Sequence, residues 1–261
     1  MRVITWLGSL DEASRLDGLP PVDAAEQERA RAFTSDVARE RFGTLRRIQR
    51  GLLAEALGAE PGRLLSSYDC PDCGFGAGHG RPGYLLAGPA TDPQRATAAG
   101  SAALPGTGAS EAGEPLRLSD VALSASRAGE WGAVVVVAGV ERGFRIGLDL
   151  TLHEEIFDGF DDVALSGPEK SWLDGQPPAR RNAGRAALWA AKEAAAKRDG
   201  HGLRKDPARI AVLAAAEDRG SEAGYAPGVV RLETRAEGLP PHALMAAVPA
   251  AAEDAFRRAT A

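Results

Sequence analysis

The chain has 261 residues, a net charge of −5 and 44% hydrophobic residues. This length allows a sizeable hydrophobic core, in one domain or in two similar halves. The acidic balance argues against a general nucleic-acid-binding protein, which normally carries a basic excess. Residues 1–10 meet Asp11 and Glu12 at once, unlike a signal peptide, and the apolar run 133–138 is too short to span a bilayer. We therefore expect a cytoplasmic protein with no nucleic-acid or membrane partner.

The first part of the chain predicts one strand, a helical stretch and a second short strand. Residues 2–7 are typical of a strand, and residues 23–57 predict a largely helical segment that ends at Gly58. Residues 84–86 predict another short strand. From 87 to 115 the chain contains mainly Ala, Gly, Ser, Thr and Pro without an apolar period, which predicts a disordered, linker-like insert.

The second part of the chain alternates strands and helices. Residues 134–137 predict a buried strand, and Gly143 allows a turn into a strand at 144–150, so we expect an antiparallel hairpin. A long helix is predicted at 179–198. The remaining predicted elements are strands at 210–213, 229–234 and 243–248 and a helix at 251–258. This order of elements indicates an α+β fold.

The strand at 144–150 carries polar residues on only one of its faces. Its period of two places Asp149 and Thr151 on the face opposite to the apolar residues. Gly147 lies on the same face as Asp149 and allows another segment to approach the backbone closely. The apolar residues are Phe144, Ile146, Leu148 and Leu150.

The long helix carries one stripe that combines an aromatic anchor with charged residues. Its members are Trp189, Lys192, Glu193, Ala196 and Lys197, spaced i, i+3, i+4, i+7 and i+8. Glu193 and Lys197 therefore project side by side, although such a pair also occurs as an ordinary helix-stabilising contact. Together with Asp149 they provide two oxygen ligands for a metal and one cation for a leaving phosphate. This set meets the needs of a magnesium-dependent reaction of a diphosphate.

Both segments resemble the signature of the Sfp-type 4'-phosphopantetheinyl transferase superfamily, a G-[IV]-D-[IV]-E strand followed by a W-x-x-K-E-[AS]-x-x-K helix. The chain has G-L-D-L-T at 147–151, W-A-A-K-E-A-A-A-K at 189–197 and G-H-G-L at 200–203. Family-like motifs also precede them: E-Q-E-R-A-R-A-F at 26–33, R-R-I-Q-R-G-L-L at 46–53, L-G at 57–58, H-G-R-P at 79–82 and S-A-S-R-A-G at 124–129. The resemblance runs from residue 22 to residue 205, interrupted mainly by the insert.

The resemblance implies a fold, a reaction and a set of partners. It implies two pseudo-symmetric α+β halves, here residues 1–138 and 139–261, with the active site in the cleft between them. The implied reaction is the magnesium-dependent transfer of the phosphopantetheine arm from coenzyme A to a serine of an acyl or peptidyl carrier protein. Such a reaction serves fatty-acid or secondary-metabolite synthesis. We expect a monomer that uses Mg²⁺ as cofactor and coenzyme A as substrate.

The resemblance also assigns roles to single residues. Asp149 and Glu193 would hold the magnesium, with Thr151 contributing directly or through a water. Glu193 would take the serine proton and Lys197 would neutralise the leaving phosphate, so these two are the catalytic residues. Coenzyme A binding falls to Arg29, His79, Arg81, Ser126, Arg127, Asp149 and Lys197. Lys192 is either a structural or a partner-facing residue.

Two positions depart from the family pattern. Thr151 stands where the family has a glutamate, and Arg127 stands where it has a histidine. A threonine can still hold a water for magnesium, and an arginine can still bind a phosphate through its fork of donors. The departures keep open a second interpretation, in which the chain is a non-catalytic relative or a zinc-knuckle interaction protein.

The cysteines are spaced C-x-x-C as Cys70 and Cys73, followed by His79. Cys70 and Cys73 are candidates for zinc, but a closed structural zinc site needs four ligands and only three candidates lie nearby. Two reduced thiols in a loop and a redox pair are the alternatives. His79 has a competing role beside the predicted phosphate-binding G-R-P.

Overall fold

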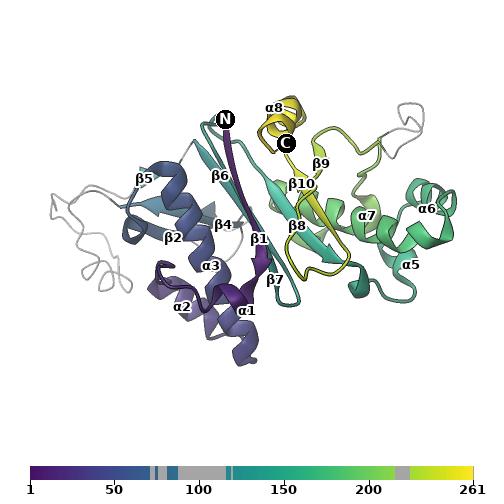
Figure 1. Ribbon diagram of the computed structural model, residues 1–261. Coiled ribbons are helices and arrows are strands. Elements are labelled where there is room, and N and C mark those ends of the chain that lie inside the picture. The colour runs from purple at the N-terminus through teal and green to yellow at the C-terminus, as the bar shows by residue number, and fades with distance from the viewer. Residues whose placement is uncertain (71–73, 76–80, 88–115, 119, 215–223, 261) are drawn as a thin grey trace. The chain divides into compact units, whose positions relative to one another are not determined.

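The computed structural model describes residues 1–70, 74–75, 81–87, 116–118, 120–214 and 224–260 (Figure 1). The chain divides into two compact units. Unit 1 contains Met1–Arg15 and Asp120–Ala261, and unit 2 contains Leu16–Ser119. The predicted α+β class is confirmed, because helices and sheets occur together in both units. The division into pseudo-symmetric halves at residue 138, with a cleft between them, stays a prediction.

Unit 1 contains two antiparallel three-stranded sheets. The first sheet has the order β1-β7-β6, from β1 (Arg2–Ser9), β7 (Trp131–Ala138) and β6 (Val121–Ala128). The second has the order β8-β10-β9, from β8 (Gly147–Leu152), β10 (His242–Ala247) and β9 (Val229–Arg231). The helices of this unit are α1 (Leu10–Ala13), α5 (Phe160–Ala164), α6 (Gly167–Asp174), α7 (Pro178–Asp199) and α8 (Glu253–Thr260).

Two hydrophobic clusters lie on opposite faces of the β8-β10-β9 sheet. On one face, Leu148 and Leu150 pack with Val135 of β7 and Phe256 of α8. On the other face, the buried side of α7 packs against Met245 and its neighbours on β10. The long helix and the strand that carries Asp149 are therefore fixed to the same sheet, as the green α7 beside β8 and β10 in Figure 1 shows.

In the described residues of unit 2, two α-helices accompany one four-stranded antiparallel sheet. The helices are α2 (Ala24–Ala30) and α3 (Asp36–Leu57), and the sheet has the order β3-β2-β4-β5, from β3 (Gly74–Phe75), β2 (Leu64–Cys70), β4 (Arg81–Leu86) and β5 (Leu116–Arg117). Gly58 ends α3 in the left-handed conformation with φ 60°, so the predicted stop is confirmed. The helical stretch predicted at 23–57 is interrupted between α2 and α3. The Oγ of Ser35 accepts a hydrogen bond from Ala38 N and so caps the start of α3.

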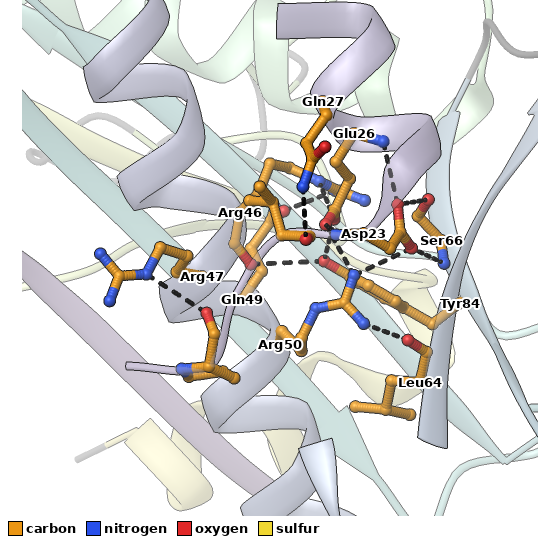
Figure 2. A network of polar contacts seen from close by, with 12 residues as sticks. Asp23, Glu26, Gln27, Arg46, Arg47, Gln49, Arg50, Leu64, Ser66 and Tyr84 are labelled. Atoms are coloured by element: carbon orange, nitrogen blue, oxygen red, sulfur yellow. Dashed lines mark hydrogen bonds and ion pairs between the residues drawn. The ribbon is translucent and has the colours of Figure 1, made fainter. Parts of the chain in front are cut away.

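A buried polar network joins α2, α3 and β4 within unit 2 (Figure 2). Glu26 is fully buried and accepts hydrogen bonds from Arg46 Nε at 2.8 Å, Arg50 Nη2 at 2.6 Å and Tyr84 Oη at 3.0 Å. Asp23 caps α2 and also accepts from Arg50 Nη2 at 2.9 Å. Because a buried carboxylate is costly unless it is paired, this network fixes α2 in one orientation on α3.

The structure corrects three predicted elements. The expected hairpin is wrong: β7 pairs with β1 and β6, while β8 pairs with β10. The reason is that β7 is buried almost throughout and has both edges occupied, which leaves no edge for β8. Residues 210–213 form no strand but a single bridge between Leu213 and Tyr225. The strand predicted at 144–150 begins only at Gly147, after a turn in which Gly143 has φ 90°.

Other predicted elements are found close to their expected bounds. The helix predicted at 179–198 is α7, and the strands predicted at 243–248 and 2–7 are β10 and β1. The predicted insert lies outside the described residues, apart from Ala87, whose N–H donates to Arg63 O at 2.8 Å. Within the described ranges, no helix is long and apolar enough to cross a membrane.

Candidate functional site

Asp149 and Thr151 lie on the face of β8 that points to α7, as the alternation predicts. Their neighbours Leu148 and Leu150 belong to the hydrophobic cluster on the opposite face. Both polar residues are buried: Asp149 is 5% exposed and Thr151 is 2% exposed. A carboxylate at this depth needs partners, because burial of a lone charge is costly.

Gly147 brings the backbone of α7 into direct contact with β8. A methyl group at Gly147 would lie 1.8 Å from the carbonyl oxygen of Ala194 and 2.7 Å from the N of Arg198. No side chain fits between these two backbones, so only glycine allows the strand and the helix to approach this closely. The predicted close approach at Gly147 is therefore confirmed, and it places Asp149 beside the last two turns of α7.

The carboxylate of Asp149 has three partners. Lys197 Nζ lies 2.6 Å from Oδ1, Ser126 Oγ donates to Oδ1 at 2.7 Å, and Thr151 Oγ1 donates to Oδ2 at 2.9 Å. Lys197 Nζ also donates to Leu148 O at 3.1 Å and to Ser126 Oγ at 3.2 Å. The structure thus brings together four residues that the sequence had singled out, from β6, β8 and α7.

Ser124 contributes a contact that the sequence did not reveal. Its Oγ accepts a hydrogen bond from Leu148 N at 2.9 Å, so β6 holds the backbone of β8 next to Asp149. Ser124 and Ser126 lie two residues apart and therefore on the same face of β6. The period-two pair of serines was the available signal, but a serine in a strand has many ordinary uses.

Glu193 stands near Asp149 without a hydrogen-bonding partner among the residues that the structure describes. The pKa of its half-buried carboxyl is raised, mainly by burial and also by the negative charge of Asp149, while Lys197 lowers it. The pKa of Glu155 is also raised, first by burial and in part by Asp149. Sequence reasoning missed Glu155, which lies beyond the end of β8. The electrostatic environment around Asp149 thus favours an added cation near Glu193.

These donors fit a magnesium ion better than a zinc ion. The carboxylates of Asp149 and Glu193 and the hydroxyl of Thr151 are hard oxygen ligands, which Mg²⁺ prefers, and the ion usually keeps several waters. In the described ranges, no group of three or more His, Cys, Asp or Glu side chains is placed to hold a metal. Magnesium binding by the carboxylates of Asp149 and Glu193 stays a prediction.

The predicted phosphate ligands of unit 2 are only partly described. Arg29 lies with its Cζ 4.6 Å from the centroid of the Tyr68 ring, in a cation–π contact. Arg81 begins β4, where its backbone pairs with Asp69. His79 lies outside the described residues. The two units are described separately, so coenzyme A binding by these residues stays a prediction.

Arg127 and Cys70 lie in strands of different sheets. Arg127 lies near the end of β6, opposite Gly132, and its side chain is exposed. Cys70 is the last residue of β2 and pairs with Gly74, whereas Cys73 lies outside the described residues. Zinc binding by Cys70 and Cys73 therefore stays a prediction.

Residues 145–238 match the family model of the 4'-phosphopantetheinyl transferase superfamily. The matched stretch contains β8 and α7, and with them Asp149, Thr151, Glu193 and Lys197; Ser126 lies before it. No curated protein matches the chain. The predicted resemblance to this superfamily is confirmed for the matched stretch, and the match supports a transferase of the phosphopantetheinyl class.

Proposed function

We propose that the protein transfers the phosphopantetheine arm of coenzyme A to a serine hydroxyl of an acyl or peptidyl carrier protein, with Mg²⁺ as cofactor. One observation carries the proposal: Lys197 of α7 pairs with Asp149 of β8, and Glu193 of α7 lies near enough for the charge of Asp149 to raise its pKa, all inside the stretch that matches the superfamily. Two acidic groups and one ammonium at a single point suit a reaction whose barrier comes from charge on a diphosphate.

Asp149 and Glu193 would hold the magnesium, with Thr151 contributing its hydroxyl or a water. Ser126 and Thr151 orient the Asp149 carboxylate through hydrogen bonds to both of its oxygens. This fixed orientation reduces the rearrangement that the site needs when it is loaded. When bound, the ion would supply positive charge that neutralises the diphosphate.

Glu193 would act as the general base for the serine of the carrier protein. The serine oxygen forms a bond to the phosphorus that carries the pantetheine arm, and the bond from that phosphorus to the oxygen of adenosine 3',5'-bisphosphate breaks. The serine proton would pass to Glu193, directly or through a water.

Lys197 would bind the phosphate of the leaving group. Its side chain is 30% exposed, so its ammonium could exchange Asp149 for a substrate oxygen. As the bond to phosphorus breaks, negative charge grows on the leaving oxygen, and a positioned ammonium stabilises that charge. Arg29, His79, Arg81 and Arg127 are the proposed further phosphate ligands.

The test is mass spectrometry of an apo carrier protein after incubation with the protein, coenzyme A and Mg²⁺. The carrier should gain one phosphopantetheine arm, and a carrier whose acceptor serine is replaced by alanine should gain nothing. Asp149→Asn keeps the size of the side chain and serves as the matched inactive variant. If no carrier protein from fatty-acid, polyketide or peptide synthesis is modified, the chain is a non-catalytic relative of the superfamily.

A further inference from the structure

Lys192 is completely buried, although it stands next to Glu193 in the charged stripe of α7. Its Nζ lies 2.8 Å from Glu169 Oε2 and donates to the carbonyl oxygens of Pro207 at 2.9 Å and Ile210 at 2.8 Å. An ammonium has three donors, so these three acceptors use all of them. The side chain has no exposed surface with which to contact coenzyme A or a partner protein.

The contacts of Lys192 join three segments of unit 1. Glu169 belongs to α6, where its Oε2 also accepts hydrogen bonds from Ser166 N and Ser166 Oγ, both at 2.8 Å. The residues Pro207 and Ile210 lie at the two ends of a short turn that follows α7. Lys192 therefore connects α7 to α6 and to this turn through a single buried charge.

This connection acts on the orientation of α7. Neighbouring residues of a helix point in directions that differ by about 100°. Lys192 is held on one side of α7 while Glu193 lies on the side that faces Asp149 and Lys197 follows one turn later. The backbone contact at Gly147 sets the distance between α7 and β8. The Lys192 contacts oppose rotation of α7 about its axis.

We propose that Lys192 and Glu169 are positioning residues that fix the rotation of α7 and thereby direct Glu193 and Lys197 toward Asp149. The role in catalysis rests on the proposed transferase function, whereas the structural role does not. The charge of Lys192 matters because an apolar side chain of the same length would leave the buried Glu169 carboxylate without its counter-charge, with only the two Ser166 donors, and would remove the side-chain donor of the Ile210 carbonyl group. Lys192 itself touches no substrate and is not a catalytic residue.

The experiment compares the full chain with Lys192→Met, Glu169→Gln and the control Phe256→Leu. Phe256 is fully buried in α8 and lies in the cluster on the opposite face of the sheet, so its variant loses packing without touching α7's polar contacts. Turnover is measured at a temperature at which every variant is folded. We expect kcat to fall at least tenfold in Lys192→Met and clearly in Glu169→Gln, with KM for coenzyme A changed less than twofold. Phe256→Leu should keep the parent's kcat.

A second measurement does not depend on activity and covers the case in which Lys192→Met folds poorly. Amide hydrogen exchange should become faster at 193–198 and at 208–210 in Glu169→Gln, but not in Phe256→Leu at equal overall stability. Unchanged kcat and unchanged exchange in Glu169→Gln would overturn the positioning role. A parent chain that modifies no carrier protein, but whose exchange responds as expected, would instead refute the transferase function and leave the anchoring of α7 intact.

Discussion

Lys197 Nζ lies 2.6 Å from Asp149 Oδ1 and so occupies the position of a cation bound to that carboxylate. The two charges neutralise one another in a site where Asp149 is buried. If Asp149 binds magnesium as proposed, the ion would compete with Lys197, and the released ammonium would become available for a phosphate oxygen. The contact between Lys197 and Asp149 would then lower the magnesium affinity of the site.

Lys197→Met should bind Mg²⁺ more tightly than the parent chain. Removing a charge that competes for Asp149 should raise the affinity roughly tenfold, since two unit charges at 4 Å interact by about 1 to 4 kcal/mol near a protein surface. Arg198→Met is the matched control, because Arg198 is the next residue of α7 and pairs with Asp199 instead. Titration calorimetry measures both. Equal gains in the two variants would show a general effect of net charge and not a competition at Asp149.

Restoring an acid at position 151 should also increase the magnesium affinity. Thr151 Oγ1 lies 2.9 Å from Asp149 Oδ2 and is 2% exposed, so Thr151→Glu places a second carboxylate beside the first in a buried site. Without metal, this repulsion should lower the melting temperature; with Mg²⁺, the loss should be recovered. Thr151→Gln has the same size without the charge and should show no such recovery. Differential scanning fluorimetry in EDTA and in Mg²⁺ decides between the outcomes.

The strand face and the helix spacing of the candidate site residues could be predicted because they follow local periods. Period two on β8 placed Asp149 and Thr151 on one face, and the helical period placed Glu193 and Lys197 one turn apart. The contact between the two elements was also implied by Gly147, since a missing side chain in a strand indicates a close neighbour.

The supporting contacts were not predictable in the same way. Lys192 belongs to the same stripe as Glu193, and nothing in its spacing shows that it is buried on Glu169 of another helix. The pairing of β8 with β10 depends on which strand edges are free, which periodicity does not encode. Ser124 acts through a hydrogen bond from the backbone N–H of Leu148, and the period-two pair of serines does not by itself indicate that contact.

The raised pKa of Glu193 predicts how stability depends on pH in the metal-free chain. Its ordinary pKa is 4.5, and burial together with Asp149 raises the value in the folded state. Below pH 4.5 Glu193 is protonated in both the folded and the unfolded state, so its burial does not lower the free energy of unfolding. As the pH rises through the raised folded-state pKa, the buried carboxyl becomes charged and the free energy of unfolding falls. Glu193→Gln should therefore melt at a higher temperature than the parent at pH 8 in EDTA, and at the same temperature near pH 4. A difference that does not depend on pH would contradict the raised pKa.

Gly147→Ala should separate β8 from α7 and so remove activity and stability together. The added methyl group would lie 1.8 Å from the Ala194 carbonyl oxygen and 2.7 Å from Arg198 N. Both are backbone atoms of α7, which cannot move away by a change of rotamer as a side chain can. Forced overpacking of this kind costs about 1 to 3 kcal/mol or more. Gly43→Ala is the matched control, because Gly43 lies within α3 with open space around it, and alanine there should stabilise the helix by up to about 1 kcal/mol. Urea unfolding gives both free energies.

The transfer assay on folded Gly147→Ala should show a lower kcat, because Glu193 and Lys197 move away from Asp149 with the helix. A Gly147→Ala variant as stable and as active as the parent would mean that the helix does not rest on the strand at this glycine.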